Sequence, residues 1–174
     1  ELLQIAMSNT ERLIRLINDI LDVERMEAGE TALRREPLRL RAIVESTIAA
    51  LEGFAREHGV TLAITSGPAD AELIGDPDRL TQVLTNLISN AVKFSRDGDV
   101  VRLRVRAVAP GESGLSGPAI FIEVIDRGIG IRSDDQQLIF EEFRQVDGGS
   151  TRNMGGTGLG LALVKRFAEM HGGR

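Results

Sequence analysis

Three segments of this 174-residue chain combine residue types that could bind a ligand: phosphate, a hard cation or a flat group. The first, residues 155–161, reads Gly-Gly-Thr-Gly-Leu-Gly-Leu and continues into an apolar-periodic run that predicts a helix. A glycine-rich turn that opens a helix presents free backbone N–H groups and the positive end of the helix dipole to an anion. Phosphate fits such a turn, although glycine clusters also form plain flexible loops.

The second segment carries polar residues at helical spacing. Asn86, Asn90 and Lys93 lie within a run, residues 78–94, that predicts a helix, and their spacing of four and three places them on one face. Asparagine is a mediocre helix former, and a merely solvated face would more often carry Glu, Lys or Arg. The favoured hypothesis is that the amide oxygens ligate a cation such as Mg²⁺ while the lysine ammonium meets phosphate.

The third segment begins at Asp126, directly after an apolar run over 119–125 that predicts a strand covered on both faces. An aspartate at a strand end either forms a turn or accepts a directional hydrogen bond, and the two glycines that follow allow a flat ligand to approach. Residues 146–156 are polar and glycine-rich, which is typical of a mobile lid. Arg152 would meet a phosphate when this lid closes, or else be an exposed loop cation.

The remaining elements must position these segments. Residues 1–29 predict one helix whose apolar residues step by four and three, the seam spacing of a coiled coil or bundle, with Gly29 as its end. We expect it to pack on a second copy or another chain; the alternative is a core helix of the main domain. The other expected helices cover 41–58, 78–94 with Asp76 as cap, a short piece near 134–140 and the run after 159. The expected strands cover 37–40, 60–65, 71–75, 100–108 and 119–125.

Composition excludes several classes of protein. A net charge of −5, 3% aromatic residues and no Trp or Tyr argue against a nucleic-acid surface. The absence of cysteine excludes disulfides and thiolate metal sites and fits a reducing compartment. No apolar run approaches the length of a transmembrane helix. We expect a cytoplasmic piece of a longer protein, and a membrane anchor elsewhere in that parent stays open.

Taken together and in this order, the segments resemble the catalytic, ATP-binding part of sensor histidine kinases of two-component systems. Residues 86–94 are similar to the N box of that family, and residues 126–130 to its G1 box. Residues 140–143 resemble the F box and residues 156–160 the G2 box. The amino-acid sequence of the lid, over 145–156, is similar to that of hybrid-type kinases. The likeness spans nearly the whole chain.

The resemblance implies a role for each matching residue. Asp126 would accept a hydrogen bond from the adenine amino group, and Asn90, with Asn86, would hold Mg²⁺. Lys93 and Arg152 would contact the phosphates of ATP. The further ATP-binding residues that it implies are Phe94, Gly128, Gly130, Ile131, Phe143, Gly156, Thr157, Gly158, Leu159 and Gly160.

The implied fold is an α/β (α+β) two-layer sandwich, a mixed sheet with three helices on one face, known as the Bergerat-type ATP-binding fold. One long bundle helix would precede it. Residues 1–30 would be the second helix of a dimerisation and phosphoacceptor hairpin, and residues 31–174 the ATP-binding domain. Because the final strands of the family are missing from this sequence, we expect an exposed sheet edge.

The implied activity is that of a protein-histidine kinase, which binds Mg-ATP and donates the γ-phosphoryl group to a histidine on the hairpin of the same or a second chain. A response-regulator receiver domain would act downstream, and the parent would form a homodimer through its first helix. The box with the acceptor histidine is absent. Since His58 and His171 lie at predicted helix ends, we expect that this chain does not phosphorylate itself.

Two alternatives remain. ATP hydrolases of the same superfamily (gyrase, the Hsp90 chaperones and MutL) carry a glutamate where this chain has Asn86, and an amide cannot take a proton from the attacking water. The second alternative is a non-catalytic nucleotide-binding and dimerisation module, against which the intact boxes argue.

Overall fold

The structure is a computed structural model that describes residues 2–66, 72–111, 114–115, 117–145 and 157–174. The chain divides into two compact units. The sheet unit consists of residues 33–133 and 164–174, and the α1 unit consists of residues 1–32 and 134–163. Segments distant in sequence therefore share each unit.

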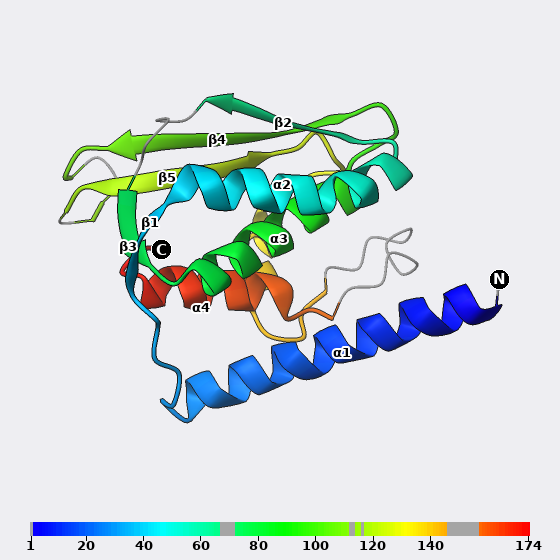
Figure 1. The fold of residues 1–174 in the computed structure, drawn as a ribbon, viewed down its shortest axis with the longest axis horizontal. Helices are drawn as coiled ribbons and strands as arrows, with labels where there is room; N and C mark the ends of the chain where they lie inside the picture. The colour runs from blue at the N-terminus through cyan, green and yellow to red at the C-terminus, as the bar shows by residue number, and fades with distance from the viewer. Residues whose placement is uncertain (1, 67–71, 112–113, 116, 146–156) are drawn as a thin grey trace. The chain divides into compact units, whose positions relative to one another are not determined.

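The sheet unit is built on a mixed three-stranded sheet (Figure 1). Its strands are β2 (Thr61–Ser66), β4 (Val100–Val108) and β5 (Ala119–Ile125), in the order β2-β4-β5. β2 runs parallel to β4, and β4 runs antiparallel to β5. Strands β1 (Glu36–Arg39) and β3 (Glu72–Gly75) pair antiparallel in a separate ribbon. The predicted mixed sheet is confirmed.

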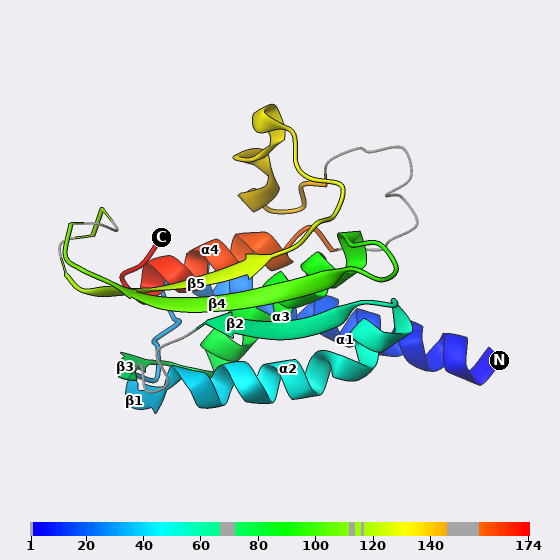
Figure 2. The same cartoon turned by 90° about the horizontal axis from the view of Figure 1, so that it is seen from above.

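Helices cover one face of this sheet (Figures 1 and 2). They are α2 (Leu40–Glu57), α3 (Pro77–Phe94) and the part of α4 (Gly160–Met170) that belongs to the sheet unit. α2 packs on α3 and β2, and α3 also contacts β4 and β5. The helix bounds agree with the expected ranges to within one or two residues, because periodic apolar positions and turn signals bracket each run.

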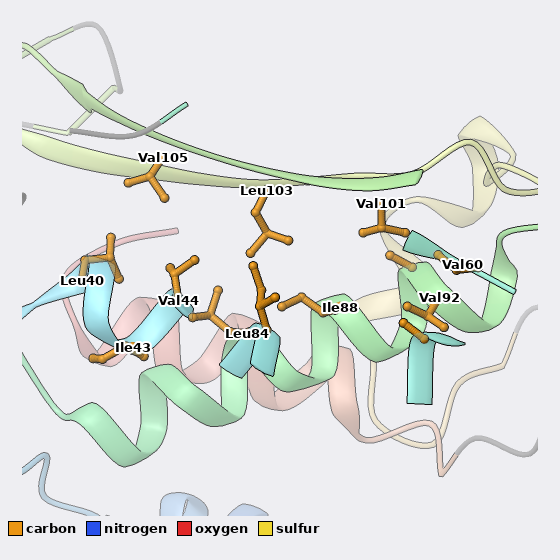
Figure 3. Packing of buried hydrophobic residues seen from close by; sticks show 13 residues of the cluster. Leu40, Ile43, Val44, Val60, Leu84, Ile88, Val92, Val101, Leu103 and Val105 are labelled. Atoms are coloured by element: carbon orange, nitrogen blue, oxygen red, sulfur yellow. The ribbon is translucent and has the colours of Figure 1, made fainter. Parts of the chain in front are cut away.

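The core of the sheet unit lies between the sheet and the helices (Figure 3). On β4, Val101, Leu103 and Val105 are buried, while the arginines between them remain half-buried or exposed, as the alternating pattern predicts. Each fully buried leucine or isoleucine contributes about 1.5–3 kcal/mol of transfer free energy. The buried cluster comprises Leu40, Ile43, Val44, Ile48, Ala55, Val60, Leu84, Ile88, Ala91, Val92, Val101, Leu103 and Val105.

Strand β5 differs from its prediction as a strand covered on both faces. All seven of its residues are half-buried, and it pairs only with β4 among the described strands. One face of β5 packs on the core. On the other face, Phe121 lies under the Arg106 guanidinium, with 4.5 Å from its carbon to the ring centroid, and Glu123 pairs with Arg104 at 3.7 Å. An edge strand whose outer face carries such pairs needs no second apolar layer.

The α1 unit contains α1 (Leu2–Glu27), and Gly29 follows it with a φ of +69°, so the predicted helix and its end are confirmed. The short helix expected near 134–140 is instead two 3₁₀ turns, η1 (Ser133–Asp135) and η2 (Leu138–Phe140). So short a segment cannot offset the cost of nucleating an α-helix. No helix in the described part of the chain has the combined length and apolar content that a membrane span needs.

Candidate functional site

Helix α3 carries the predicted polar stripe. Asn86, Asn90 and Lys93 are all half-buried, whereas Leu84 and Ile88 on the core side are fully buried. A purely solvated face would expose these polar side chains. Their partial burial places two amides and an ammonium at the rim of the core, in the last three turns of the helix.

The start of α3 is fixed by Asp76. Its Oδ1 accepts hydrogen bonds from the backbone N–H groups of Asp78 and Arg79 at 3.1 and 3.2 Å, and its Oδ2 accepts one from the N–H of Arg34 at 2.9 Å. Burial alone would raise the pKa of Asp76, but these three hydrogen bonds and the Arg34 charge outweigh it and hold that pKa below its ordinary value. With Pro77 as the first helical residue, this cap sets the register of the whole polar stripe.

The turn after β5 lies against the end of α3. The exposed Asp126 accepts a hydrogen bond from the N–H of Gly128 at its Oδ1, 2.8 Å away, which folds the turn back on itself. A Cβ on Gly128 would stand 2.4 Å from the carbonyl oxygen of Phe94, so only glycine permits this approach. Gly130 has a φ of +72°, and Ile131 beside it is 49% exposed. The sheet unit thus brings Asp126 and Gly128 next to Phe94.

The glycine-rich turn at the start of α4 is built within the α1 unit. Gly158 has a φ of +76°, and a Cβ there would stand 2.8 Å from the carbonyl carbon of Phe143. Phe143 itself adopts a φ of +58° and is 63% exposed. Leu159 is fully buried, and its N–H donates to Thr157 Oγ1 at 3.2 Å. The structure therefore places Phe143 beside the turn that continues into Gly160.

Two predicted residues, Arg152 and Gly156, lie outside the described residues, as does the whole of the expected lid, residues 146–156. The other thirteen fall into two groups. Asn86, Asn90, Lys93, Phe94, Asp126, Gly128, Gly130 and Ile131 belong to the sheet unit. Phe143, Thr157, Gly158, Leu159 and Gly160 belong to the α1 unit.

Sequence reasoning missed the part that His171 plays. Its Nε2 accepts a hydrogen bond from the N–H of Asp76 at 3.0 Å, so the proton resides on Nδ1, which donates to the carbonyl of Phe167 at 2.7 Å. A Cβ on Gly75 would stand 3.0 Å from the ring, so a glycine there makes room for it. His58, in contrast, ends α2 as predicted. No local signal marks His171, because its partner lies 95 residues away.

Sequence reasoning also missed Asp19, a half-buried carboxyl in the second half of α1. Burial, followed by the charge of Asp22, raises the pKa of Asp19 above its ordinary value. The apolar spacing of α1 marks the residues on either side of Asp19, and only the burial in the folded chain distinguishes Asp19 itself.

The sequence and the fold of this chain both match known proteins. Residues 75–174, which include α3 and both glycine turns, match the family described as "Histidine kinase-, DNA gyrase B-, and HSP90-like ATPase". The chain belongs to this ATPase family. Its similarity to individual members extends further, over the whole described chain including α1.

Two relatives and one solved structure illustrate how this ATPase-family chain compares. It is 39% identical over 173 residues to hybrid signal transduction histidine kinase D of Dictyostelium discoideum, covering 98% of this chain and 11% of that protein. It is 40% identical over 166 residues to the circadian input-output histidine kinase CikA of Synechococcus elongatus, covering 94% of this chain and 21% of that protein. The chain thus spans a small part of the curated relatives that it matches.

The solved structure is that of full-length ShkA in complex with AMPPNP. It superposes with a TM-score of 0.77 and 28% identity, covering 95% of this chain and 32% of that chain. The resemblance to sensor histidine kinases and the two-layer fold that it implies are therefore confirmed.

Proposed function

We propose that this chain is the ATP-binding catalytic part of a sensor histidine kinase, which binds Mg-ATP and donates its γ-phosphoryl group to a histidine on a dimerisation hairpin. One observation carries the proposal: in a member of this ATPase family, the Asp126–Gly128 turn lies against Phe94, at the end of the helix with the Asn86, Asn90 and Lys93 stripe. The proposed site combines the Asp126 carboxylate that follows β5 with the two amides and the ammonium on the C-terminal half of α3.

Asp126 is proposed to recognise adenine. Its Oδ1 already accepts the N–H of Gly128, and a carboxylate has lone pairs left for a second donor such as an exocyclic amino group. Because the Gly128 turn is held against the Phe94 backbone, the carboxylate is oriented before the nucleotide arrives. Phe94, Gly130 and Ile131 are proposed to line the base and sugar.

The residues of α3 suit a magnesium ion bound together with phosphates. Asn86 and Asn90 lie one helical turn apart and are both half-buried, and amide oxygens are hard ligands. The described residues hold no cluster of three or more His, Cys, Asp or Glu side chains for a metal, so phosphate oxygens and water would complete the shell, as Mg²⁺ prefers. When bound, the ion would neutralise charge on the phosphates.

The proposed transfer needs positioning more than covalent chemistry from this chain. The bond between the γ-phosphorus and the β–γ bridging oxygen breaks while a bond to a histidine ring nitrogen forms, and ADP leaves with the bridging oxygen. Lys93 would hold the phosphate chain in line, and Phe143 and residues 157–160 would border it. Arg152 and Gly156 are proposed to join from the part of the chain that the structure does not describe.

Residues 1–30 are proposed to be the second hairpin helix and residues 31–174 the ATP-binding domain. α1 exposes an apolar stripe, which in a hairpin would pack on a first helix and a second protomer. The exposed residues of the stripe are Leu2, Leu3, Met7, Leu13, Ile14, Ile17 and Leu21, with exposed fractions of 47–84%.

A receiver domain is the proposed downstream partner, and ATP as substrate implies a cytoplasmic site of action.

Titration of the chain with a fluorescent ATP analogue, with and without Mg²⁺, tests the proposal. We expect saturable, Mg²⁺-sensitive binding that is lost in Asp126→Asn, because an amide presents an N–H donor where the amino group needs an acceptor. Glu57→Gln, which removes an exposed carboxylate from α2, should bind as the unchanged chain does. A folded chain, checked by circular dichroism, that ignores the analogue would instead support a non-catalytic docking module.

A second measurement, of acid-labile phosphate, tests the proposed transfer of the γ-phosphoryl group. The chain should form no acid-labile phosphate with Mg-ATP alone, because His171 has both ring nitrogens hydrogen-bonded and His58 lies at a helix end with Nδ1 on the Phe54 carbonyl. A purified kinase hairpin that contains its acceptor histidine should gain phosphate when added. Phosphate on the chain alone would refute the assigned division of roles.

A further inference from the structure

The face of the sheet opposite the helices carries a row of arginines. Arg102, Arg104 and Arg106 alternate along β4 with side chains that are buried in the core, so all three arginines leave the strand on the outer face. β4 is the middle strand of the three, and the helices of the sheet unit lie on the other face (Figures 1 and 2). The row therefore runs along the centre of a face that no described helix of this unit covers.

The neighbours of this row on the adjacent strands leave a net positive charge. In the β4–β5 register, Arg104 lies opposite Glu123 and Arg106 lies opposite Phe121. The Arg104 guanidinium is 3.7 Å from the Glu123 carboxylate, and the guanidinium carbon of Arg106 is 4.5 Å from the Phe121 ring centroid. β2 carries no charged residue. The three strands thus hold three positive charges against one negative, an excess of two, in a chain whose net charge is −5.

The contacts of Arg104 and Arg106 orient their guanidinium groups. The 3.7 Å contact between Arg104 and Glu123 is longer than a hydrogen bond, and the Glu123 oxygen that makes it accepts no hydrogen bond from a described residue. A guanidinium has five N–H donors in a planar fork that matches a carboxylate, so Arg104 retains donors for a second carboxylate. Stacking on Phe121 restrains Arg106, which lowers the side-chain entropy that is lost on binding.

The spacing of the row matches an acidic helix. Alternate residues of a strand lie about 6.8 Å apart, so the row spans about 13.6 Å from Arg102 to Arg106. Residues four apart on an α-helix lie about 6 Å apart along its axis, so carboxylates at i, i+4 and i+8 span about 12 Å. A helix laid along β4 thus brings one carboxylate to each arginine, and helix on sheet is a layer arrangement that domains commonly use.

Two other anionic surfaces match this face less well. Segments that bind an anionic membrane carry clusters of about four to eight basic residues, whereas the excess here is two. Single-stranded nucleic acid stacks its bases on aromatic side chains, whereas Phe121, the one aromatic residue of the three strands, lies under Arg106. Charge and spacing together therefore favour a protein helix.

We propose that the outer face of the sheet is a docking surface for an acidic helix of a partner protein, whose carboxylates at i, i+4 and i+8 bind Arg102, Arg104 and Arg106. The inference goes beyond the proposed function and does not rest on it, because none of the residues proposed to bind ATP takes part. Docking of the helix adds a third layer to the sheet unit.

Fluorescence anisotropy with a labelled, stapled helical peptide that carries glutamate at i, i+4 and i+8 tests the inference. We expect saturable binding to the unchanged chain, and binding weakened at least about tenfold when Arg102→Gln, Arg104→Gln and Arg106→Gln are combined, because three charge pairs are lost. Added salt should weaken binding to the unchanged chain, since exposed charges are screened.

Two controls separate this face from charge in general. Arg39→Gln, Arg41→Gln and Arg56→Gln together remove the same charge from exposed positions elsewhere in the sheet unit and should leave the affinity unchanged. A peptide of the same composition with its glutamates at i, i+2 and i+5 spreads them around the helix and should bind the unchanged chain more weakly.

Three results would overturn the inference: no peptide binding by the folded chain, equal binding by the triple variant of the β4 arginines, or no effect of glutamate spacing. Binding of phosphatidylserine vesicles or of an oligonucleotide in place of the peptide would overturn it as well. If circular dichroism shows that the triple variant is unfolded, Glu123→Gln decides instead. This variant removes the only carboxylate of the three strands, so it must bind the peptide more tightly than the unchanged chain does.

Discussion

The backbone of Phe94 and the α-carbon of Gly128 are in direct contact, so that a Cβ on the glycine would stand 2.4 Å from the Phe94 carbonyl oxygen and 2.9 Å from its carbonyl carbon. Through this contact, the end of α3 sets the position of Asp126, which accepts the Gly128 N–H. The last turn of α3 and the turn after β5 are therefore packed directly on each other.

Gly128→Ala should disrupt this contact. Because the obstructing atoms are backbone, they cannot move aside as a flexible side chain would, and we expect a loss of about 1–3 kcal/mol in the free energy of unfolding, measured with urea. Binding of the ATP analogue should weaken in parallel. Gly53→Ala is the matched control: a Cβ there meets nothing within 4 Å inside α2, so it should stabilise the chain by about 0.5–1 kcal/mol. Equal effects of the two substitutions would contradict the role of the contact.

Because of Asp76, the free energy of unfolding should fall as the solution becomes acidic. Its pKa is lower when folded than its ordinary value of 3.8, so its ionised form stabilises the fold fully above about that pH. This contribution is lost as the pH falls through the lowered folded pKa. Urea midpoints for the chain and for Asp76→Ala should therefore differ at pH 7, where losing the cap costs about 0.5–2 kcal/mol, and converge as the pH falls from 3.8 through the lower folded pKa. A difference that stays constant with pH would show that the charge is irrelevant.

The two histidines should respond differently to substitution. His171→Ala removes the acceptor of the Asp76 N–H, and Asp76 is only 7% exposed, so an unpaired buried donor should cost about 1–3 kcal/mol of unfolding free energy. His58→Ala alters an exposed helix end and should stay within about 0.5 kcal/mol. Thermal or urea unfolding of both variants measures this contrast. Comparable losses would mean that His171 is not part of the Asp76 cap.

Asn86→Glu tests the distinction between kinase and hydrolase. A carboxylate at this position on α3 can take a proton from an attacking water, which the native amide cannot, so phosphate release from Mg-ATP should rise. Asn86→Gln lengthens the side chain by the same amount without adding a base and is the control. If both variants release phosphate at the native rate, the comparison with the related hydrolases has no support at this position.

The sequence by itself determined what depends on near neighbours along the chain. Asp76 and Pro77 signal the start of α3 within its first turn, and the apolar period of residues 78–94 decides which of its faces is buried. β4 is recognisable because alternate residues of a strand point to opposite faces. The order of the four segments that resemble the N, G1, F and G2 boxes indicates the family, since residue type and spacing suffice for that comparison.

The tertiary structure decided what depends on partners distant in sequence. β5 reads as a buried strand, yet it lies at a sheet edge because strand order is set by the packing of the whole unit. The hydrogen bond between Asp76 and His171 joins residues that no local pattern relates. Helical and strand propensities act over a few residues, whereas this contact exists only once the chain has folded.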